Sequence, residues 1–281
     1  MSALGLGLIA AMCWGLHDIL VRQVSQRAPL MASLMIVLVA GSVLQAALML
    51  GTGAIAPVAL EAAAYAALSG VFFLVASISL YGAFQRGPVR LVAPIIASYP
   101  VLSVGWAAFS GAAVSGLDWL AVLAIIAGVS VVAALSTDEA ADTPPAGRTN
   151  VYALIASVGF AGTFAIGQVA TEMASDLPVI LITRLVSIAL LAALMILRRL
   201  PFNPGRSAVP VLIAMGCLDG IALMAVLSAG GLPNAQYAAV AASVFGLLTI
   251  VMAWAFLRER MGVAQWAGCL VAFAGIGYLA L

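Results

Sequence analysis

The sequence contains one long polar stretch, Ser136-Thr-Asp-Glu-Ala-Ala-Asp-Thr-Pro-Pro-Ala-Gly-Arg-Thr149, in a chain that is otherwise almost wholly apolar. Clustered polar, proline and glycine residues between apolar segments are typical of a connecting loop. The stretch therefore predicts a linker over residues 137–149, with one unit before it at 1–136 and a second unit after it at 150–281. The two units are nearly equal in length, which makes an internal duplication the first hypothesis.

The composition indicates that both units lie in a lipid bilayer. Of 281 residues, 65 % are hydrophobic and only 7 % are charged, whereas about a quarter of the residues in soluble domains are charged. Eleven arginines, no lysine and ten acidic residues leave no basic surface for nucleic acid. A helix needs about 20 apolar residues to cross the bilayer. The expected spans are 3–22, 30–50, 62–85, 89–110, 118–136, 150–171, 178–197, 207–230, 235–256 and 263–281.

The arginines predict the orientation of these spans, because basic residues in short connections stay on the cytoplasmic side. Arginines follow only the odd-numbered spans, whereas the even-numbered connections carry acidic residues such as Glu61 and Asp118. We therefore expect the odd-numbered connections in the cytoplasm and both termini outside, in a bacterial-type inner membrane.

The two units resemble each other under a shift of roughly 146 residues, which overlays Ile9–Gly15 on Ile155–Ala161. Five spans per unit is an odd number, so the second unit must enter the membrane from the opposite side. Inverted repeats of this kind are the architecture of secondary transporters, whose substrate site lies near the midplane between the halves. The sequence thus predicts an all-α membrane protein of ten transmembrane helices, arranged as two inverted five-helix repeats and working by alternating access.

Charged residues inside the membrane are functional candidates because a charge there is costly. Arg184 and Asp219 fall at nearly the same depth on consecutive spans. One interpretation is an ion pair that only fixes the packing of these spans. The other is a substrate site, in which Arg184 binds a carboxylate and Asp219 binds an amine or a coupling proton.

Two further groups of polar and aromatic residues are candidates. His17 and Asp18 are expected near the cytoplasmic edge, where Asp18 lies four residues before Arg22 and can pair with it on one helix face. One interpretation is a polar cluster at the membrane interface. The other is a cytoplasmic gate or a proton site, since a histidine titrates near neutral pH. Pro94 and Pro100 are expected to kink span four, whereas span nine has no proline. A kinked span four favours a cavity with Trp14 and Tyr99 in its wall. Gln168, Ser243 and Tyr237 are weaker polar candidates for the same site.

Other classes of function find little support. Cys13, Cys217 and Cys269 are far apart and one histidine cannot build a metal site, so no metal and no cofactor is expected. The sequence contains no metalloprotease, serine-hydrolase or aspartate-rich motif that would indicate an intramembrane enzyme. It also contains no glycine-rich filter segment that would indicate a channel. The expected partners are a small-molecule substrate, the lipid bilayer and a coupling proton. We expect a monomer, because two fused halves supply the pseudo-twofold axis.

Several motifs then resemble one known family. They are Ala11-Met-Cys-Trp-Gly15, Arg184, and the stretch Phe256-Leu-Arg-Glu-Arg-Met-Gly-Val-Ala-Gln-Trp-Ala-Gly268 followed by Ala274-Gly-Ile276. Together with ten spans and a duplication, they are similar to the EamA-like branch of the drug/metabolite transporter superfamily. The resemblance implies an exporter of small metabolites, with amino acids, including aromatic ones, as the best candidates. Drugs or nucleosides exchanged for protons are the alternative.

The resemblance also implies roles for particular residues. The family's glutamate, here Glu259, is expected to be structural at an interface and to pair with neighbouring arginines. The first unit has Met35 where the second has Arg184, so the ionic work is expected to fall to the second unit. Tyr99-Pro100 and Trp14 suit a ring-binding cavity like that of the aromatic amino acid exporters.

Overall fold

The structure, a computed structural model, describes residues 2–109, 114–135, 146–233 and 235–279, and within these ranges every regular element is a helix. The first repeat contains α1 (Ala3–Ser25), α2 (Leu30–Thr52), α3 (Leu60–Arg86), α4 (Val89–Ala97), α5 (Pro100–Phe109) and α6 (Gly116–Leu135). The second contains α7 (Ala146–Met173), α8 (Asp176–Leu197), α9 (Val209–Leu227), α10 (Gln236–Ala242), α11 (Phe245–Met252), a π-helix (Ala253–Leu257) and α12 (Val263–Leu279). The helices confirm the predicted all-α class.

The elements form ten membrane spans, because α4 with α5 and α10 with α11 and the π-helix each make one span. Among the described residues, eight helices are long and apolar enough to cross a bilayer, while the helices of spans four and ten are shorter. Residues 137–145 of the predicted linker lie outside the described residues, and α7 already begins at Ala146. Which end of the bundle faces the cytoplasm stays a prediction from the arginines.

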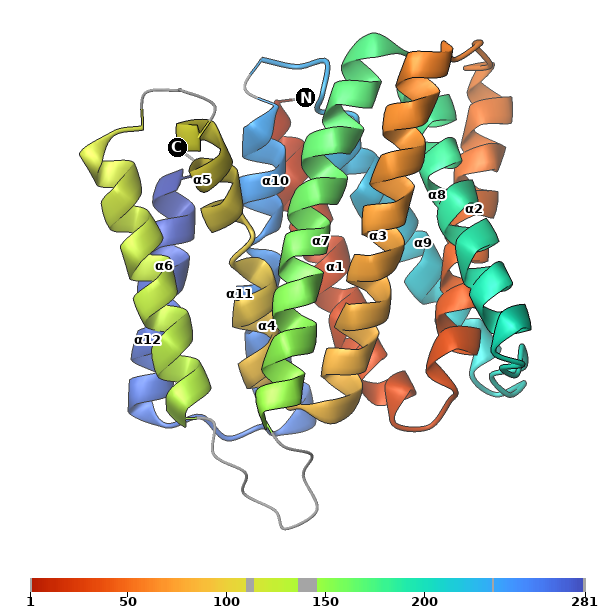
Figure 1. Cartoon of the computed structure of the whole chain (residues 1–281). Coiled ribbons are helices and arrows are strands. Elements are labelled where there is room, and N and C mark those ends of the chain that lie inside the picture. The colour runs from red at the N-terminus through yellow and green to blue at the C-terminus, as the bar shows by residue number, and fades with distance from the viewer. Residues whose placement is uncertain (1, 110–113, 136–145, 234, 280–281) are drawn as a thin grey trace.

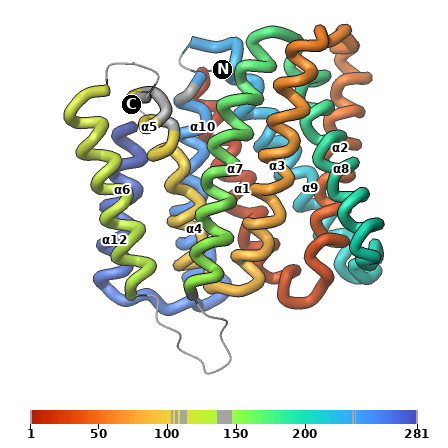
Figure 2. The backbone as a smooth tube through the Cα atoms, viewed as in Figure 1, coloured from red at the N-terminus to blue at the C-terminus, as the bar shows by residue number. Residues whose placement is uncertain are grey.

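The two repeats run through the bundle in opposite directions. In Figure 1, α1 starts at the top and descends, whereas its counterpart α7 starts at the bottom and rises. The contacts follow a twofold pattern: α3 packs on α7 as α9 packs on α1, and α2 packs on α9 as α8 packs on α3. Counterpart spans also pack on each other, through α2 with α8, α4 with α11 and α6 with α12. The tube in Figure 2 follows the same path, and the prediction of inverted repeats is confirmed.

Small residues allow these helices to approach closely. A Cβ atom on Gly128 of α6 would lie 2.3 Å from the carbonyl oxygen of Gly268 on α12. One on Gly70 of α3 would lie 2.4 Å from the carbonyl oxygen of Thr183 on α8. In lipid the hydrophobic effect does not drive helices together, so van der Waals contact between close backbones replaces it. The glycines therefore hold the two repeats together.

Spans four and nine are both interrupted near their middles. In span four, Pro100 has no N–H to donate to the preceding turn, and the Ser98 hydroxyl donates to the carbonyl of Ile95 at 2.7 Å. In span nine, the Ser243 hydroxyl donates to Val240 at 2.6 Å, and tight turns of the i to i−3 type separate α10 from α11. The expectation that only the proline-containing span would bend was therefore incomplete. Interrupted helices at matching places in two inverted halves are typical of transporter binding sites.

Glu259 joins the end of span nine to the start of span four. Its two carboxylate oxygens accept the backbone N–H groups of Val89 and Arg90, at 2.9 and 3.0 Å. These N–H groups lie at the free N-terminus of α4, where a negative charge is favourable. Glu259 thus works at an interface between the repeats, as the sequence indicated, and it does so by capping a helix.

Candidate functional site

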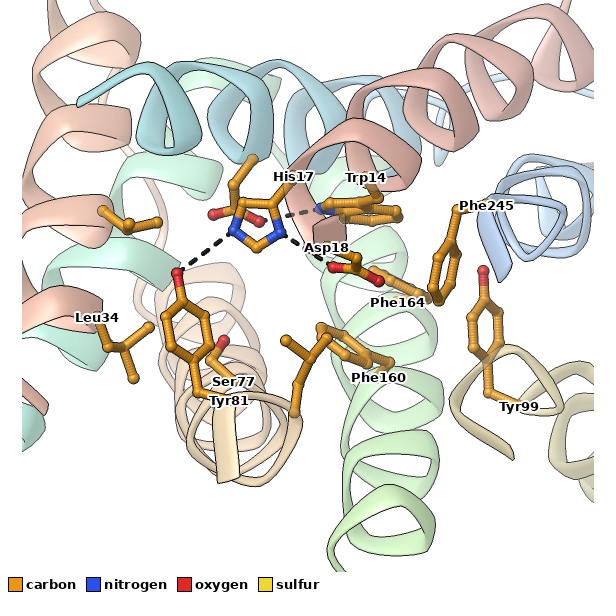
Figure 3. A pocket seen from close by; sticks show the side chains of 13 residues that line it. Trp14, His17, Asp18, Leu34, Ser77, Tyr81, Tyr99, Phe160, Phe164 and Phe245 are labelled. Atoms are coloured by element: carbon orange, nitrogen blue, oxygen red, sulfur yellow. Dashed lines mark hydrogen bonds and ion pairs between the residues drawn. The ribbon is translucent and has the colours of Figure 1, made fainter. Parts of the chain in front are cut away.

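A narrow pocket lies in the middle of the bundle, where the two repeats meet. The centre of a water molecule can move through only about 20 Å³ of the pocket. This is room for about one or two water molecules. Figure 3 shows the side chains that line it. The lining residues are Trp14, His17, Asp18, Leu34, Val37, Ser77, Leu80, Tyr81 and Tyr99 from the first repeat and Phe160, Phe164, Asp219 and Phe245 from the second.

Aromatic rings form one wall of the pocket. The Trp14 ring stacks on Phe164 with centroids 5.4 Å apart and meets Phe245 edge-on at 6.2 Å. Tyr99, at the break in span four, meets Phe164 at 5.3 Å, and its hydroxyl donates to the Ala239 carbonyl of α10 at 2.5 Å. This wall offers flat apolar surfaces to which a ring or a cation can bind.

The wall follows the pseudosymmetry of the chain. Trp14 and Phe160 are counterparts, 146 positions apart, as are Tyr99 and Phe245, and all four line the pocket. The acidic residues break this symmetry, since Asp18 corresponds to Phe164 and Asp219 corresponds to Phe73. The pocket is therefore symmetric in its rings and asymmetric in its charges.

Asp219 of α9 is fully engaged with protein groups. Its Oδ1 accepts the indole N–H of Trp14 at 3.0 Å, and its Oδ2 accepts Nη2 of Arg184 at 2.6 Å. Arg184 on α8 is 0 % exposed, and its guanidinium carbon lies 5.4 Å from the centre of the Phe73 ring. Gly41 of α2 makes room for it, because a Cβ there would lie 2.6 Å from Nη1 of Arg184. Asp219 lines the pocket, but Arg184 lies behind it.

His17 and Asp18 are buried and contribute to the central pocket. They are 4 % and 1 % exposed and line the same pocket as Asp219. His17 Nδ1 lies 3.1 Å from Asp18 Oδ1, and the Tyr81 hydroxyl lies 3.4 Å from His17 Nε2. The expected helical pair of Asp18 with Arg22 is replaced, since Arg22 donates to the carbonyl of Phe84 at 2.6 Å. The first repeat therefore supplies ionisable groups to the pocket, contrary to the expectation that the second would do all the ionic work.

The weaker candidates are engaged elsewhere. Ser243 is buried at the break in span nine, where it bonds Val240, and it is not among the lining residues. Gln168 donates to the carbonyls of Val226 and Ala235, both at 3.1 Å. Neither Ser243 nor Arg184 reaches the pocket surface in this conformation, so their assignment to substrate binding stays a prediction.

Several lining residues were missed by the sequence analysis. Phe160 and Phe164 are four residues apart and so share one face of α7, and Phe160 is the counterpart of Trp14. Shifting each aromatic candidate by 146 positions leads from Trp14 to Phe160 and from Tyr99 to Phe245, so the duplication could have predicted both residues. Nothing in the sequence marks Ser77 and Tyr81 of α3, because span three is rich in both apolar and small polar residues.

Comparison with known proteins places the chain in a family. The profile of the EamA-like transporter family matches residues 1–134 and again residues 147–281. The chain belongs to the EamA-like transporter family. This family lies within the drug/metabolite transporter superfamily, so the chain is a multi-pass membrane protein of a family that transports small molecules.

Solved structures agree on the fold. Twenty-six chains of solved structures match this EamA-like transporter. One crystal structure is 17 % identical, with a TM-score of 0.75, and the match covers 99 % of this chain and 98 % of that one. At such low identity the likeness shows the fold alone. No curated protein matches the sequence.

Proposed function

We propose that this chain is a secondary transporter that exports small metabolites with an aromatic or other apolar body, aromatic amino acids included. It binds them in the central pocket and releases them by alternating access. The observation that carries the proposal is the position of the pocket, which is lined by both inverted repeats and flanked by an interruption in span four and another in span nine.

The aromatic wall supports the choice of substrate body. Trp14 lies against Phe164 and Phe245, and Tyr99 lies against Phe164, with ring centroids 5.4, 6.2 and 5.3 Å apart. Stacking on such rings adds about 0.5–1.5 kcal/mol beyond burial of the ring's area. Arg184 does not support recognition of a substrate carboxylate, because it is buried against Asp219 and Phe73.

The pocket must widen before it can hold a metabolite, because it has room for about one or two water molecules. The interruptions at Ser98 and Ser243 are suited to this widening. Each leaves half-helices that can tilt separately, and Gly246 of α11 packs directly on Ala97 of α4. Alternating access then consists of a rearrangement of one repeat against the other around a fixed site.

Counterflow in liposomes tests this proposal. The protein is reconstituted into vesicles that are preloaded with one unlabelled compound: phenylalanine, tryptophan, a nucleoside or 2-phenylethylamine. We expect the preload to accelerate uptake of the same compound in labelled form. Replacing Phe164 with leucine removes a stacked ring from the wall, so the initial rate for aromatic substrates is expected to fall about 2- to 10-fold.

Phe202→Leu is the matched control, since Phe202 is 50 % exposed and lies between α8 and α9. It is expected to leave the rate unchanged. Equal counterflow rates of an aromatic substrate in Phe164→Leu and Phe202→Leu would contradict the proposal, because the substrate would then bind outside the central pocket.

A further inference from the structure

We propose that Asp18 binds the ammonium group of a positively charged substrate, so that among molecules with the same ring this transporter prefers amines to zwitterions and zwitterions to carboxylates. The inference rests on the proposed function for the location of the site and adds the charge that the site selects.

The carboxylate of Asp18, a residue of the pocket lining, has one oxygen without a hydrogen-bond partner among the described residues. Oδ1 pairs with His17 Nδ1 at 3.1 Å, whereas Oδ2 is buried and has no hydrogen-bond partner. The side chain is 2 % exposed and belongs to the pocket lining. A buried carboxylate oxygen without a donor is unfavourable, so this atom calls for a donor from a bound molecule. An ordered water in the narrow pocket can supply one when no substrate is present.

Asp219 is a weaker candidate for this role, because both of its oxygens already accept hydrogen bonds from the protein. One of its oxygens receives the Trp14 indole N–H and the other receives the Arg184 guanidinium. Its negative charge is also balanced at close range by Arg184, which is itself buried. Of the two carboxylates in the described pocket lining, Asp18 is therefore the one with an oxygen that accepts no hydrogen bond.

The surroundings of Asp18 favour a cation over an anion. Among the described residues, the pocket lining includes no arginine, and the chain has no lysine. Figure 3 shows the Asp18 carboxylate between the His17 ring and the rings of Phe160, Phe164 and Phe245. The faces of aromatic rings attract cations. A carboxylate with an open oxygen beside several rings is a suitable site for an ammonium group attached to an apolar body.

Among the titratable groups that the structure describes around the pocket, His17 is the one group of the lining that can carry a positive charge. His17 of α1, Tyr81 of α3, Tyr99 of span four and Asp219 of α9 line it, and Arg184 of α8 lies behind Asp219. His17 is held between Asp18 and the Tyr81 hydroxyl. Arg184 pairs with Asp219, so the cation of a bound substrate has no arginine among the described residues to compete with it at Asp18.

Three probes with one ring test the inference: 2-phenylethylamine, phenylalanine and 3-phenylpropionate, which carry a positive charge, both charges and a negative charge. Their binding to the purified full chain in lipid nanodiscs is measured by calorimetry. We expect the amine to bind at least about tenfold more tightly than the carboxylate, with phenylalanine between them, since a tenfold ratio needs only about 1.4 kcal/mol.

Asp18→Asn then tests the residue. It keeps the shape of the side chain and an acceptor oxygen for His17, but it removes the charge, so affinity for the amine is expected to fall at least about tenfold while that for the carboxylate is unchanged or rises. Asp118→Asn is the matched control, because Asp118 caps the start of α6 through the N–H of Ser115, outside the pocket.

Two results would overturn the inference: tighter binding of the carboxylate than of the amine, or equal affinity of Asp18→Asn and Asp118→Asn for the amine. The comparison of probes needs only the wild-type chain, so it holds even where Asp18→Asn fails to fold. Binding with the expected preference but no counterflow would contradict the proposed transport and leave the charge selection standing. Counterflow that accepts all three probes equally would contradict the charge selection and leave the proposed transport standing.

Discussion

Arg184→Ala is expected to cost about 3–5 kcal/mol of folding free energy, because it leaves the buried carboxylate of Asp219 without its counter-charge. The residue contacts three other helices, through Asp219 of α9, the Phe73 ring of α3 and the space beside Gly41 of α2. Thermal unfolding in detergent, followed by circular dichroism, measures the loss. Arg206→Ala, in the exposed connection before α9, is the control and is expected to be neutral.

A double variant separates an ion pair that stabilises packing from a substrate site. Replacing both Arg184 and Asp219 with leucine removes both charges, so it is expected to be more stable than Arg184→Ala, although Trp14 loses its acceptor. Equal stability of Arg184→Ala and Arg206→Ala would show that the pair contributes nothing to the fold. It would also return Arg184 to the list of residues free to bind a carboxylate.

Gly275→Leu is expected to destabilise the protein by about 3 kcal/mol through overpacking. A Cβ at this position of α12 would lie 2.7 Å from the Ala121 carbonyl oxygen and 2.9 Å from Ile125 on α6. A backbone oxygen inside a helix cannot move aside, so α6 and α12 must separate. Their contact is one of those that join counterpart spans of the two repeats.

Gly277→Leu is the control for this variant on the same helix. A Cβ on Gly277 meets nothing within 4 Å, and leucine favours helix over glycine by about 0.8–1 kcal/mol, so stability is expected to be unchanged or slightly raised. Unfolding curves of the two variants give the comparison. Similar curves for both would mean that close approach of α6 and α12 does not hold the repeats together.

The sequence predicted the helices well, because the length of an apolar run and the polar residues between runs are local properties. Every expected span is present, and most ends agree within a few residues. The break in span nine was not predicted, since no proline marks it. It arises from tight turns at Ser243 and from the packing of Gly246 on Ala97 of the other repeat, which is a tertiary contact.

The site was predicted in part. Trp14, Tyr99 and Asp219 were chosen for their depth in the membrane, and all three line the pocket. His17 and Asp18 were placed near an edge because depth was measured along the chain to the nearest arginine. That estimate ignores the packing of α1 against α9, which brings Asp18 and Asp219 to one cavity.

Alternating access of the central pocket is tested most directly at Ser77, a pocket residue of α3 that is 6 % exposed. In a chain with Cys13, Cys217 and Cys269 replaced by alanine, Ser77→Cys is treated with a small membrane-impermeant thiol reagent from either side of oriented vesicles. Ser69→Cys, which replaces a serine bonded to the Thr163 carbonyl outside the pocket, is the control and is expected to stay unlabelled. We expect reagent added from either side to label Ser77→Cys, and saturating substrate to slow the labelling. Labelling from one side only, under every condition, would contradict alternating access of the pocket.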